Sequence, residues 1–269
     1  MKITVLGCGA AGGVPLLGNV WGNCDPSNPK NRRTRCSILV EDIVDNKTTS
    51  VLIDTSPDMR EQLLLHNVQN IDAVVWTHSH ADHCHGIDDL RSLNWLVQKP
   101  IPVYSNDETI RDLSLRFPYI FSGSTKHNKD GDEIFSIPSV KPHSLVFNQN
   151  GVANISVNHL SVNACLQPHG YTNTLGLRFG DFAYATDVSD FNENSIKMFS
   201  GIKVWLLGCI RTQFHCAHFN IEQALHWINI VKPQKTFLTH MNQDLDYQKL
   251  LDILPQGVFP AYDGLVIEC

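Results

Sequence analysis

The sequence contains no Cys-x-x-Cys pair, no long apolar run and no excess of basic residues. Eight cysteines are scattered over 269 residues, so we expect free and mostly buried thiols rather than a disulfide framework. No apolar stretch approaches the roughly 18 residues that a membrane span needs. The N-terminus begins like a buried strand and not like a leader peptide. We therefore expect a cytoplasmic protein that does not enter a membrane.

Charge is also scarce, because charged residues make up only 18% of the chain and the formal net charge is −6. A negative protein has no global field that would hold long nucleic acid or anionic lipid. A small phosphorylated substrate, such as a nucleotide, could still bind at one local cationic site. The apolar fraction of 42% excludes disorder, and 17 glycines without a period exclude a collagen-like chain.

Short apolar segments separated by turn residues predict a mixed α/β chain. Strands are expected at residues 2–6, 37–40, 50–53, 71–76, 102–104, 175–179, 182–185, 204–207, 236–238 and 264–268. Helices are expected at residues 57–66, 88–97, 107–117, 221–231 and 245–254. The segment 121–166 shows only short β-like runs. Because strands occur both in hairpins and in strand–helix units, the sheets should be mixed, and we predict one domain over residues 1–269.

One segment has a high density of metal-ligating side chains. His78, His80, Asp82 and His83 follow directly on the apolar strand at 71–76. On an extended chain His78 and His80 point to the same side, and a turn into a helix would direct Asp82 and His83 to a second point. Imidazole and carboxylate groups are ligands of zinc and similar divalent ions. The segment therefore predicts a metal site at the end of a strand.

The pattern His-x-His-x-Asp-His after an apolar strand resembles the metallo-β-lactamase superfamily. The resemblance implies a four-layer αββα sandwich with two mixed sheets and two divalent metal ions, Zn or Mn, at the sheet edges; Fe fits the same ligand types. It also implies three further ligands that follow later strands. The first metal would be held by His78, His80 and His169, the second by Asp82, His83 and His240, and Asp187 would bridge them.

Motifs along nearly the whole chain resemble the PhnP-like and PQQ-synthesis-B-like branch of that superfamily. They lie in the glycine-rich segment 7–15, in residues 52–58, and near the C-terminus in residues 239–247 and 261–264. In PhnP-like hydrolases a cysteine cluster after the first glycines holds an extra structural zinc. Only Cys24 stands in the corresponding stretch here, so we expect no third zinc.

Further candidates lie outside the ligand set. His218 precedes a predicted helix, at a place where the resemblance implies a histidine that contacts phosphate and assists proton transfer, and His215 competes for this role. The predicted catalytic residues are His218 and Asp82, the latter also a ligand. Asp54 is expected to orient a ligand histidine through its other ring nitrogen; a simple turn residue is the alternative.

Two further segments suggest phosphate or nucleotide binding. Arg32, Arg33 and Arg35 form a local cationic run that suits phosphate, although a solvated loop explains the run equally well. Glycines at 7, 9 and 12 follow a strand, as in dinucleotide-binding proteins. No helix is predicted after them, because Pro15 and later glycines interrupt the segment, and dinucleotide binding is therefore not predicted.

Residues and resemblance together predict a dinuclear metal-dependent hydrolase. The favoured function is a phosphodiesterase that acts on a small cyclic phosphate or a nucleotide-like phosphoester through a metal-bridging hydroxide. The alternatives are a carboxyl-ester, lactone or thioester hydrolase on the same metals, a tRNA-processing nuclease, and a non-catalytic carrier that resembles the PQQ-synthesis-B branch. The nuclease is disfavoured because the chain has no long basic arm. A small phosphorylated substrate is the expected partner, and a homodimer is compatible with the sequence.

Overall fold

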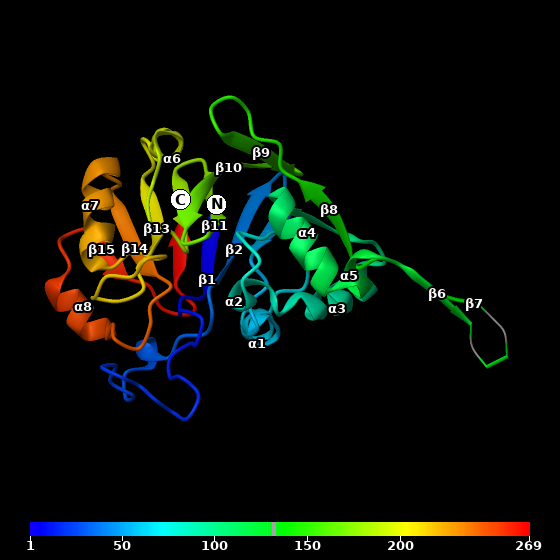
Figure 1. The fold of residues 1–269 in the computed structure, drawn as a ribbon, viewed down its shortest axis with the longest axis horizontal. Coiled ribbons are helices and arrows are strands. Elements are labelled where there is room, and N and C mark those ends of the chain that lie inside the picture. The colour runs from blue at the N-terminus through cyan, green and yellow to red at the C-terminus, as the bar shows by residue number, and fades with distance from the viewer. Residues whose placement is uncertain (128, 131–132) are drawn as a thin grey trace.

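Two seven-stranded sheets pack face to face in the computed structural model, which describes residues 1–127, 129–130 and 133–269 (Figure 1). The first sheet has the order β16 (Val266–Glu268), β1 (Lys2–Gly7), β2 (Ser37–Val44), β3 (Lys47–Ile53), β4 (Ala73–Val75), β5 (Ile101–Ser105) and β8 (Val140–Ser144). The second has the order β15 (Val258–Pro260), β14 (Lys235–Thr239), β13 (Val204–Gly208), β12 (Phe182–Ala185), β11 (Thr172–Phe179), β10 (Leu160–His169) and β9 (Val152–Val157). One core cluster contains buried residues of both sheets.

Both sheets are mixed, as the sequence predicts. Strands β3, β4, β5 and β8 are parallel, and so are β12, β13, β14 and β15, whereas the other pairs in the two sheets are antiparallel. Strand β13 is buried along its whole length, as expected for a parallel strand covered on both faces. Loops that follow the carboxyl ends of parallel strands collect at one edge of a sheet, where open α/β sheets bind ligands.

Helices cover the outer faces of both sheets. On the first sheet lie α1 (Met59–Leu65), α2 (Ala81–Cys84), α3 (Leu90–Val97), α4 (Asp107–Arg116) and α5 (Pro118–Phe121), with the 3₁₀ turn Ile87–Asp89. On the second lie α6 (Glu193–Phe199), α7 (Ile221–Val231) and α8 (Tyr247–Ile253). Another 3₁₀ turn, Pro29–Asn31, lies in the N-terminal loop. The four layers are therefore αββα, as the resemblance implies.

Helix α7 has the bounds that its sequence predicts. The Asn220 side chain accepts a hydrogen bond from the Gln223 N–H at 2.9 Å, and Gln223 Oε1 accepts one from the Asn220 N–H at 3.1 Å. This reciprocal pair is a capping box, which satisfies two main-chain donors at the start of the helix. At its C-terminal end Lys232 adopts a left-handed conformation before Pro233, so the helix cannot continue.

The middle of the chain is more regular than its sequence suggests. Strand β10 is ten residues long and is hydrogen-bonded on both sides, whereas only short runs were expected there. Polar residues such as Ser161 and Asn163 alternate with buried ones along it and weaken the apolar pattern. Helix α6 and strand β15 were also not expected, because both are short. The hairpin of β6 (Ser124–His127) and β7 (Glu133–Ser136) extends from the body (Figure 1), and residues 128 and 131–132 of this segment lie outside the described residues.

The chain ends lie side by side on neighbouring antiparallel strands (Figure 1). The Met1 amino group donates to the Cys269 carbonyl at 3.0 Å. All eight cysteines are free and six of them are buried, which confirms the expectation of free thiols. Among the described residues, no helix combines the length and the apolar character that crossing a membrane requires.

Candidate metal centre

The structure brings all seven predicted ligands together where the edges of the two sheets meet. His78 and His80 follow β4, and Asp82 and His83 lie on the short helix α2. The other three, His169, Asp187 and His240, come from the opposite sheet, at the end of β10 or shortly after β12 and β14. The seven residues form two groups, and within each group the candidate ligand atoms lie within 4.8 Å of one another. The first group is His78, His80 and His169, and the second is Asp82, His83, Asp187 and His240.

Sharp turns at the strand ends direct these side chains to the centre. Asp54, Asp187 and His240 have φ angles of 64°, 48° and 57°. This left-handed region is uncommon for residues other than glycine, and it costs conformational energy that the surrounding structure must offset. Asp54 and His240 directly follow β3 and β14, and Asp187 stands two residues after the end of β12. The turn therefore places a polar side chain at the sheet edge. If the strand continued instead, the side chain would point away from the centre.

Asp54 orients one histidine of each group. His83 Nδ1 donates to Asp54 Oδ2 at 2.7 Å. The Thr77 hydroxyl donates to the same oxygen at 2.8 Å and faces His78 Nδ1 at 3.0 Å, so it accepts from that ring. Because both Nδ1 atoms are used in this way, both Nε2 atoms are free to face the centre. The expected contact of Asp54 with the other ring nitrogen of a candidate ligand is present for His83, and the sequence does not predict its reach to His78 through Thr77.

His169, from the opposite sheet, is oriented by the main chain. Its Nδ1 donates to the Ala217 carbonyl at 2.7 Å, and its Nε2 lies 3.3 Å from His80 Nδ1. A Cβ atom on Gly170 would approach Ala217 Cβ to 3.1 Å, so the turn after His169 packs tightly on this loop. The loop that contains His218 therefore also fixes a candidate ligand of the first group.

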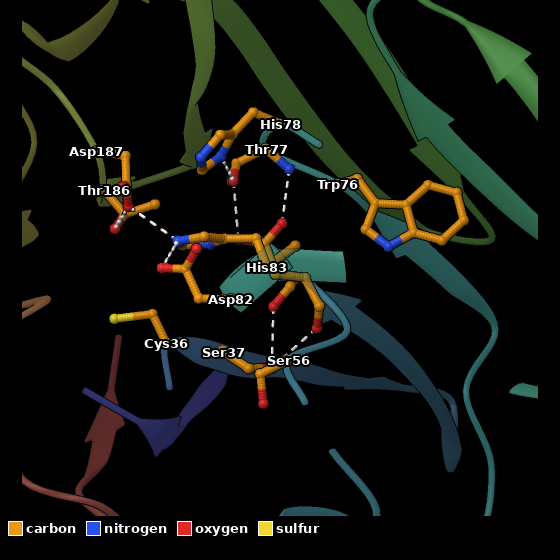
Figure 2. Close-up of polar contacts among 12 residues, drawn as sticks. Cys36, Ser37, Ser56, Trp76, Thr77, His78, Asp82, His83, Thr186 and Asp187 are labelled. Carbon is orange, nitrogen blue, oxygen red and sulfur yellow. Dashed lines mark hydrogen bonds and ion pairs between the residues drawn. The ribbon is translucent and has the colours of Figure 1, made fainter. Parts of the chain in front are cut away.

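Carboxylates and imidazoles alternate around the second group, and Figure 2 shows His83 with Asp82 and Asp187. His83 Nε2 lies 3.2 Å from Asp82 Oδ2 and 3.1 Å from Asp187 Oδ2. His240 Nε2 lies 3.3 Å from Asp82 Oδ2 and 3.4 Å from Asp187 Oδ1. Burial opposes a charge on His83, but the nearby carboxylates outweigh it and raise the pKa of the ring well above its usual value. The cluster therefore stabilises positive charge at its centre.

The pKa values of Asp82 and Asp187 shift in the opposite direction, downward. Burial alone would raise the pKa of Asp187, but His240 and His83 hold it well below the usual range. The pKa of Asp82 is also lowered, because His83 and His240 outweigh its burial. Both carboxyl groups are therefore ionised at neutral pH, which is the state that binds a cation.

The donors present fit a divalent metal. The Nε2 atom of His78 is buried and has no hydrogen-bond partner among the described residues. A buried polar atom without a partner is costly, and a metal ion at the centre would satisfy it. His/Asp sets of this kind suit Zn, Mn and Fe. His80 is exposed while the second group is buried throughout, so the first group is the more accessible to solvent.

His218 lies closer to the centre than His215. Its Nδ1 is 3.6 Å from Asp187 Oδ1, and its ring stacks on His240 with centroids 4.9 Å apart. It also forms a third candidate ligand group with His169 and Asp187. Burial lowers the pKa of His218 to about 3, so its ring is neutral at neutral pH. His215 contacts the His218 ring, and its Nδ1 accepts from the Ala217 N–H at 3.1 Å.

Arg116 is a site residue that sequence reasoning missed. From the end of α4 it donates to the Ser79 carbonyl, and its Nη2 lies 3.5 Å from Cys84 Sγ. The Cys84 thiol donates to the same carbonyl at 3.3 Å. Ser79 lies between His78 and His80, so these contacts hold the loop that contains the two histidines in place. No local pattern could reveal Arg116, because it follows Ser79 by 37 residues.

Cys36 lies beside the second group but is not placed among its ligands. Its Sγ is 3.5 Å from the Thr239 hydroxyl, next to His240 (Figure 2 shows Cys36 with Asp82 and His83). Burial raises the pKa of this thiol to about 12, so it is protonated at neutral pH. Cys36 is therefore a buried, protonated neighbour of the candidate centre.

We expect Asp54→Asn to weaken metal binding about 10–100-fold, the usual cost of losing an orienting partner. The carboxylate accepts from the Thr77 N–H at 2.7 Å, from the Thr77 hydroxyl and from His83. An amide would present N–H groups to some of these donors and leave one unpaired. Titration against a chromogenic chelator measures the affinity. Asp72→Asn is the control, because among the described residues the Asp72 carboxylate accepts a hydrogen bond from the Ser50 N–H alone. Unchanged affinity would show that Asp54 does not orient the ligands.

A second prediction concerns stability. Metal that binds only the folded state should stabilise it by roughly 2.7 kcal/mol at 100 times its Kd. For a chain of this size that corresponds to a rise in Tm of roughly 5–10 °C. Scanning fluorimetry with added Zn or Mn, and again after EDTA, measures the shift. A chelator that removes all metal without moving Tm would contradict a site formed by folding.

The chain can be compared with known proteins at this point. A family model described as the beta-lactamase superfamily domain matches residues 49–241, which is more than half of the chain. A protein named octanoyltransferase from Porphyromonas gingivalis is 31% identical over 267 residues, which cover 98% of this chain and 51% of that protein. The chain therefore spans about half the length of that relative.

Solved structures agree with this family. A structure described as a new diphosphatase from the PhnP family is 33% identical, with a TM-score of 0.84, and the match covers 99% of this chain and 96% of the other. Zn²⁺-bound PqqB from Methylobacterium extorquens is 18% identical with a TM-score of 0.75 over 100% of both chains, which shows a shared fold only. The chain belongs to the metallo-β-lactamase superfamily, in its PhnP-like branch.

Proposed function

We propose that the protein binds two divalent metal ions and hydrolyses a phosphoester bond in a small phosphorylated substrate. The observation that supports this most is the position of Asp187 between the two ligand groups. Its Oδ2 lies 3.1 Å from His83 Nε2 of the second group. Its Oδ1 lies 3.4 Å from His240 Nε2 of the second group and 3.8 Å from His169 Nε2 of the first. A carboxylate with one oxygen between the two groups is suited to join two metals at short distance.

Two adjacent metals, when bound, activate a water molecule and neutralise charge on the oxygens of the reacting group. Residues His78, His80 and His169 would hold one ion, Asp82, His83 and His240 the other, and Asp187 both. The polypeptide contributes the orientation of these ligands, through Asp54, Thr77 and the Ala217 carbonyl. His218, beside Asp187, is placed to contact the leaving oxygen of a substrate that enters past the exposed His80.

The class of substrate is supported by the relative in the PhnP family, whose description names a diphosphatase. Phosphodiesters and diphosphates both present a phosphorus atom with charged non-bridging oxygens, which two cations stabilise. A cyclic phosphate or a nucleotide-like ester is therefore the proposed substrate class, with a diphosphate link as the variant that this relative favours. One compact domain, a homodimer and a cytoplasmic location stay predictions.

A second candidate is a thioester or ester hydrolase on the same metals. The observation that favours it is the relative named octanoyltransferase, which matches 98% of this chain. The match covers only 51% of that relative, so this chain corresponds to about half of it. An acyl group of about eight carbons would be the substrate part to test.

The test is a comparison of substrates with the purified protein after addition of Mn or Zn. We would measure hydrolysis of 2′,3′-cyclic AMP, bis-p-nitrophenyl phosphate, ADP-ribose, octanoyl-CoA and a lactone. His78→Ala is the control for contaminating hydrolases. We expect kcat/KM to be highest for a phosphate substrate. Rapid cleavage of octanoyl-CoA or the lactone without phosphate hydrolysis would favour the second candidate, and metal binding without any turnover would favour a carrier.

A further inference from the structure

The three arginines of the segment 32–35 have three different environments. Arg32 is exposed. Arg33 is buried, and its guanidinium donates to the main-chain carbonyls of Asn242 at 3.1 Å and Leu245 at 2.7 Å. It therefore ties the N-terminal loop to the loop after His240 and is not available to a substrate. Arg35 differs from both, because it is held in place and yet partly open to solvent.

Asp58 holds Arg35 at one edge of its guanidinium only. Arg35 Nε lies 2.7 Å from Asp58 Oδ2, and the main-chain N–H of Arg35 donates to the same oxygen at 2.8 Å. The Arg35 side chain is 27% exposed. Within the described residues, neither of its terminal nitrogens has a hydrogen-bond or ion-pair partner. The guanidinium therefore presents two adjacent N–H₂ groups from a fixed position.

Arg35 and Asp58 belong to segments that flank the second ligand group. On one side, Gly9 bridges both Arg35 and Met241, the residue after His240. On the other side, Asp58 ends the loop that begins with Asp54, and the Thr55 N–H of that loop donates to the His83 carbonyl at 2.8 Å. The stem of Arg35 packs beside Gly13, where an added Cβ would lie 3.8 Å from Arg35 Cδ. Each loop is thus anchored next to a candidate ligand.

We propose that Arg35, buttressed by Asp58, binds a second phosphate group of the substrate, one that is not cleaved. The two terminal nitrogens of a guanidinium match two phosphate oxygens in a bidentate arrangement. The protein is acidic overall, so an arginine on a segment that flanks the second ligand group would attract anions locally and not through a general positive field. This inference rests on the proposed function, and it narrows the substrate to one with two phosphate groups.

The test compares substrates with one and with two phosphates. For ADP-ribose, Arg35→Gln should raise KM about 10–100-fold, the usual cost of losing hydrogen bonds between charged groups, with kcat nearly unchanged. For bis-p-nitrophenyl phosphate, which has one phosphate, KM should change less than about twofold. Arg32→Gln removes the same charge three residues earlier and is the matched control. Asp58→Asn, which keeps Arg35 but loses its buttress, should give an intermediate KM.

Binding provides a readout that does not depend on turnover. Calorimetry of the zinc-loaded protein should show ADP binding more tightly than AMP, with the difference lost in Arg35→Gln and kept in Arg32→Gln. If the wild type binds ADP in this way but cleaves no phosphate substrate, the proposed function fails and the Arg35 site stands. Equal affinity of the wild type for ADP and AMP would overturn the Arg35 site.

A purely structural role of Arg35 would give a different result. If Arg35→Gln loses metal or several degrees of Tm, Arg35→Lys is used as the test variant instead. Lysine keeps a positive charge near Asp58 but lacks the planar guanidinium that binds two phosphate oxygens. A lysine variant with normal metal content and a KM for ADP-ribose raised at least about fivefold would support the proposal. Equal losses of kcat on both substrates, in either variant, would assign Arg35 to folding and not to substrate binding.

Discussion

Asp187→Ala is expected to lower the occupancy of both metal sites together. Asp187 faces His83 and His240 with its two oxygens and also lies 3.8 Å from His169. Its loss leaves each ligand group short of an anionic donor. Activity on the best phosphate substrate should fall by more than the roughly 10–100-fold that losing an orienting partner costs. Metal content per chain, measured by plasma mass spectrometry after gel filtration, checks the prediction.

The matched control for this variant is Asp190→Ala. Asp190 is exposed on the same loop, and within the part of the chain that the structure describes its carboxylate accepts only from the adjacent Phe191 N–H, at 2.9 Å. It should keep both metals and full activity. If Asp187→Ala instead keeps two metals and full activity, Asp187 does not bridge. Loss of one metal alone would assign it to a single site.

His218→Ala is expected to lower kcat by ~10²–10⁴ on a substrate with a poor leaving group, the usual range for a general acid. The ring lies beside Asp187 and stacks on His240, within reach of a group bound at the centre. Because a nitrophenolate leaves without a proton, bis-p-nitrophenyl phosphate should lose much less than 2′,3′-cyclic AMP. Proton donation also requires the bound phosphate to raise the pKa of His218 from about 3.

Two other outcomes would assign His218 differently. Loss of metal in His218→Ala would make it a ligand, as its grouping with His169 and Asp187 allows. Equal losses of kcat on both substrates would indicate binding of the phosphate and not proton transfer. His215→Ala is the comparison in either case, because its ring contacts His218 from a less buried position. We expect it to keep its metal and most of its activity.

The sequence predicts the first half of the centre because that half is local. Four ligands stand in six residues after a buried strand, and the spacing alone places two of them on one side. His169, Asp187 and His240 carry no such pattern individually, and only the family resemblance identifies them. Their convergence depends on three separate strands ending at one edge, which a single sequence does not show.

Other parts of the site depend on contacts between distant segments. Arg116 meets Ser79, and the Ala217 carbonyl meets His169, across 37 and 48 residues. The different roles of Arg33 and Arg35 could not be separated in the sequence either, because both stand in the same polar run. Burial of Arg33 is decided by the loop after His240, which folds over it. Asp54 is the exception, since the sequence already predicts an orienting role for it, with a simple turn residue as the alternative.

The adjacent chain ends have a consequence for protein engineering. Strand β1 runs for six residues, about 20 Å, from the chain end toward the glycine-rich loop beside the metal centre. A tag or fused protein attached at either end would therefore emerge far from the ligand loops and leave substrate entry free. A short linker could also join the two ends, because Met1 and Cys269 already touch. New ends could then be opened at the exposed turn Asp45–Asn46 between β2 and β3, giving a circular permutant with an intact centre.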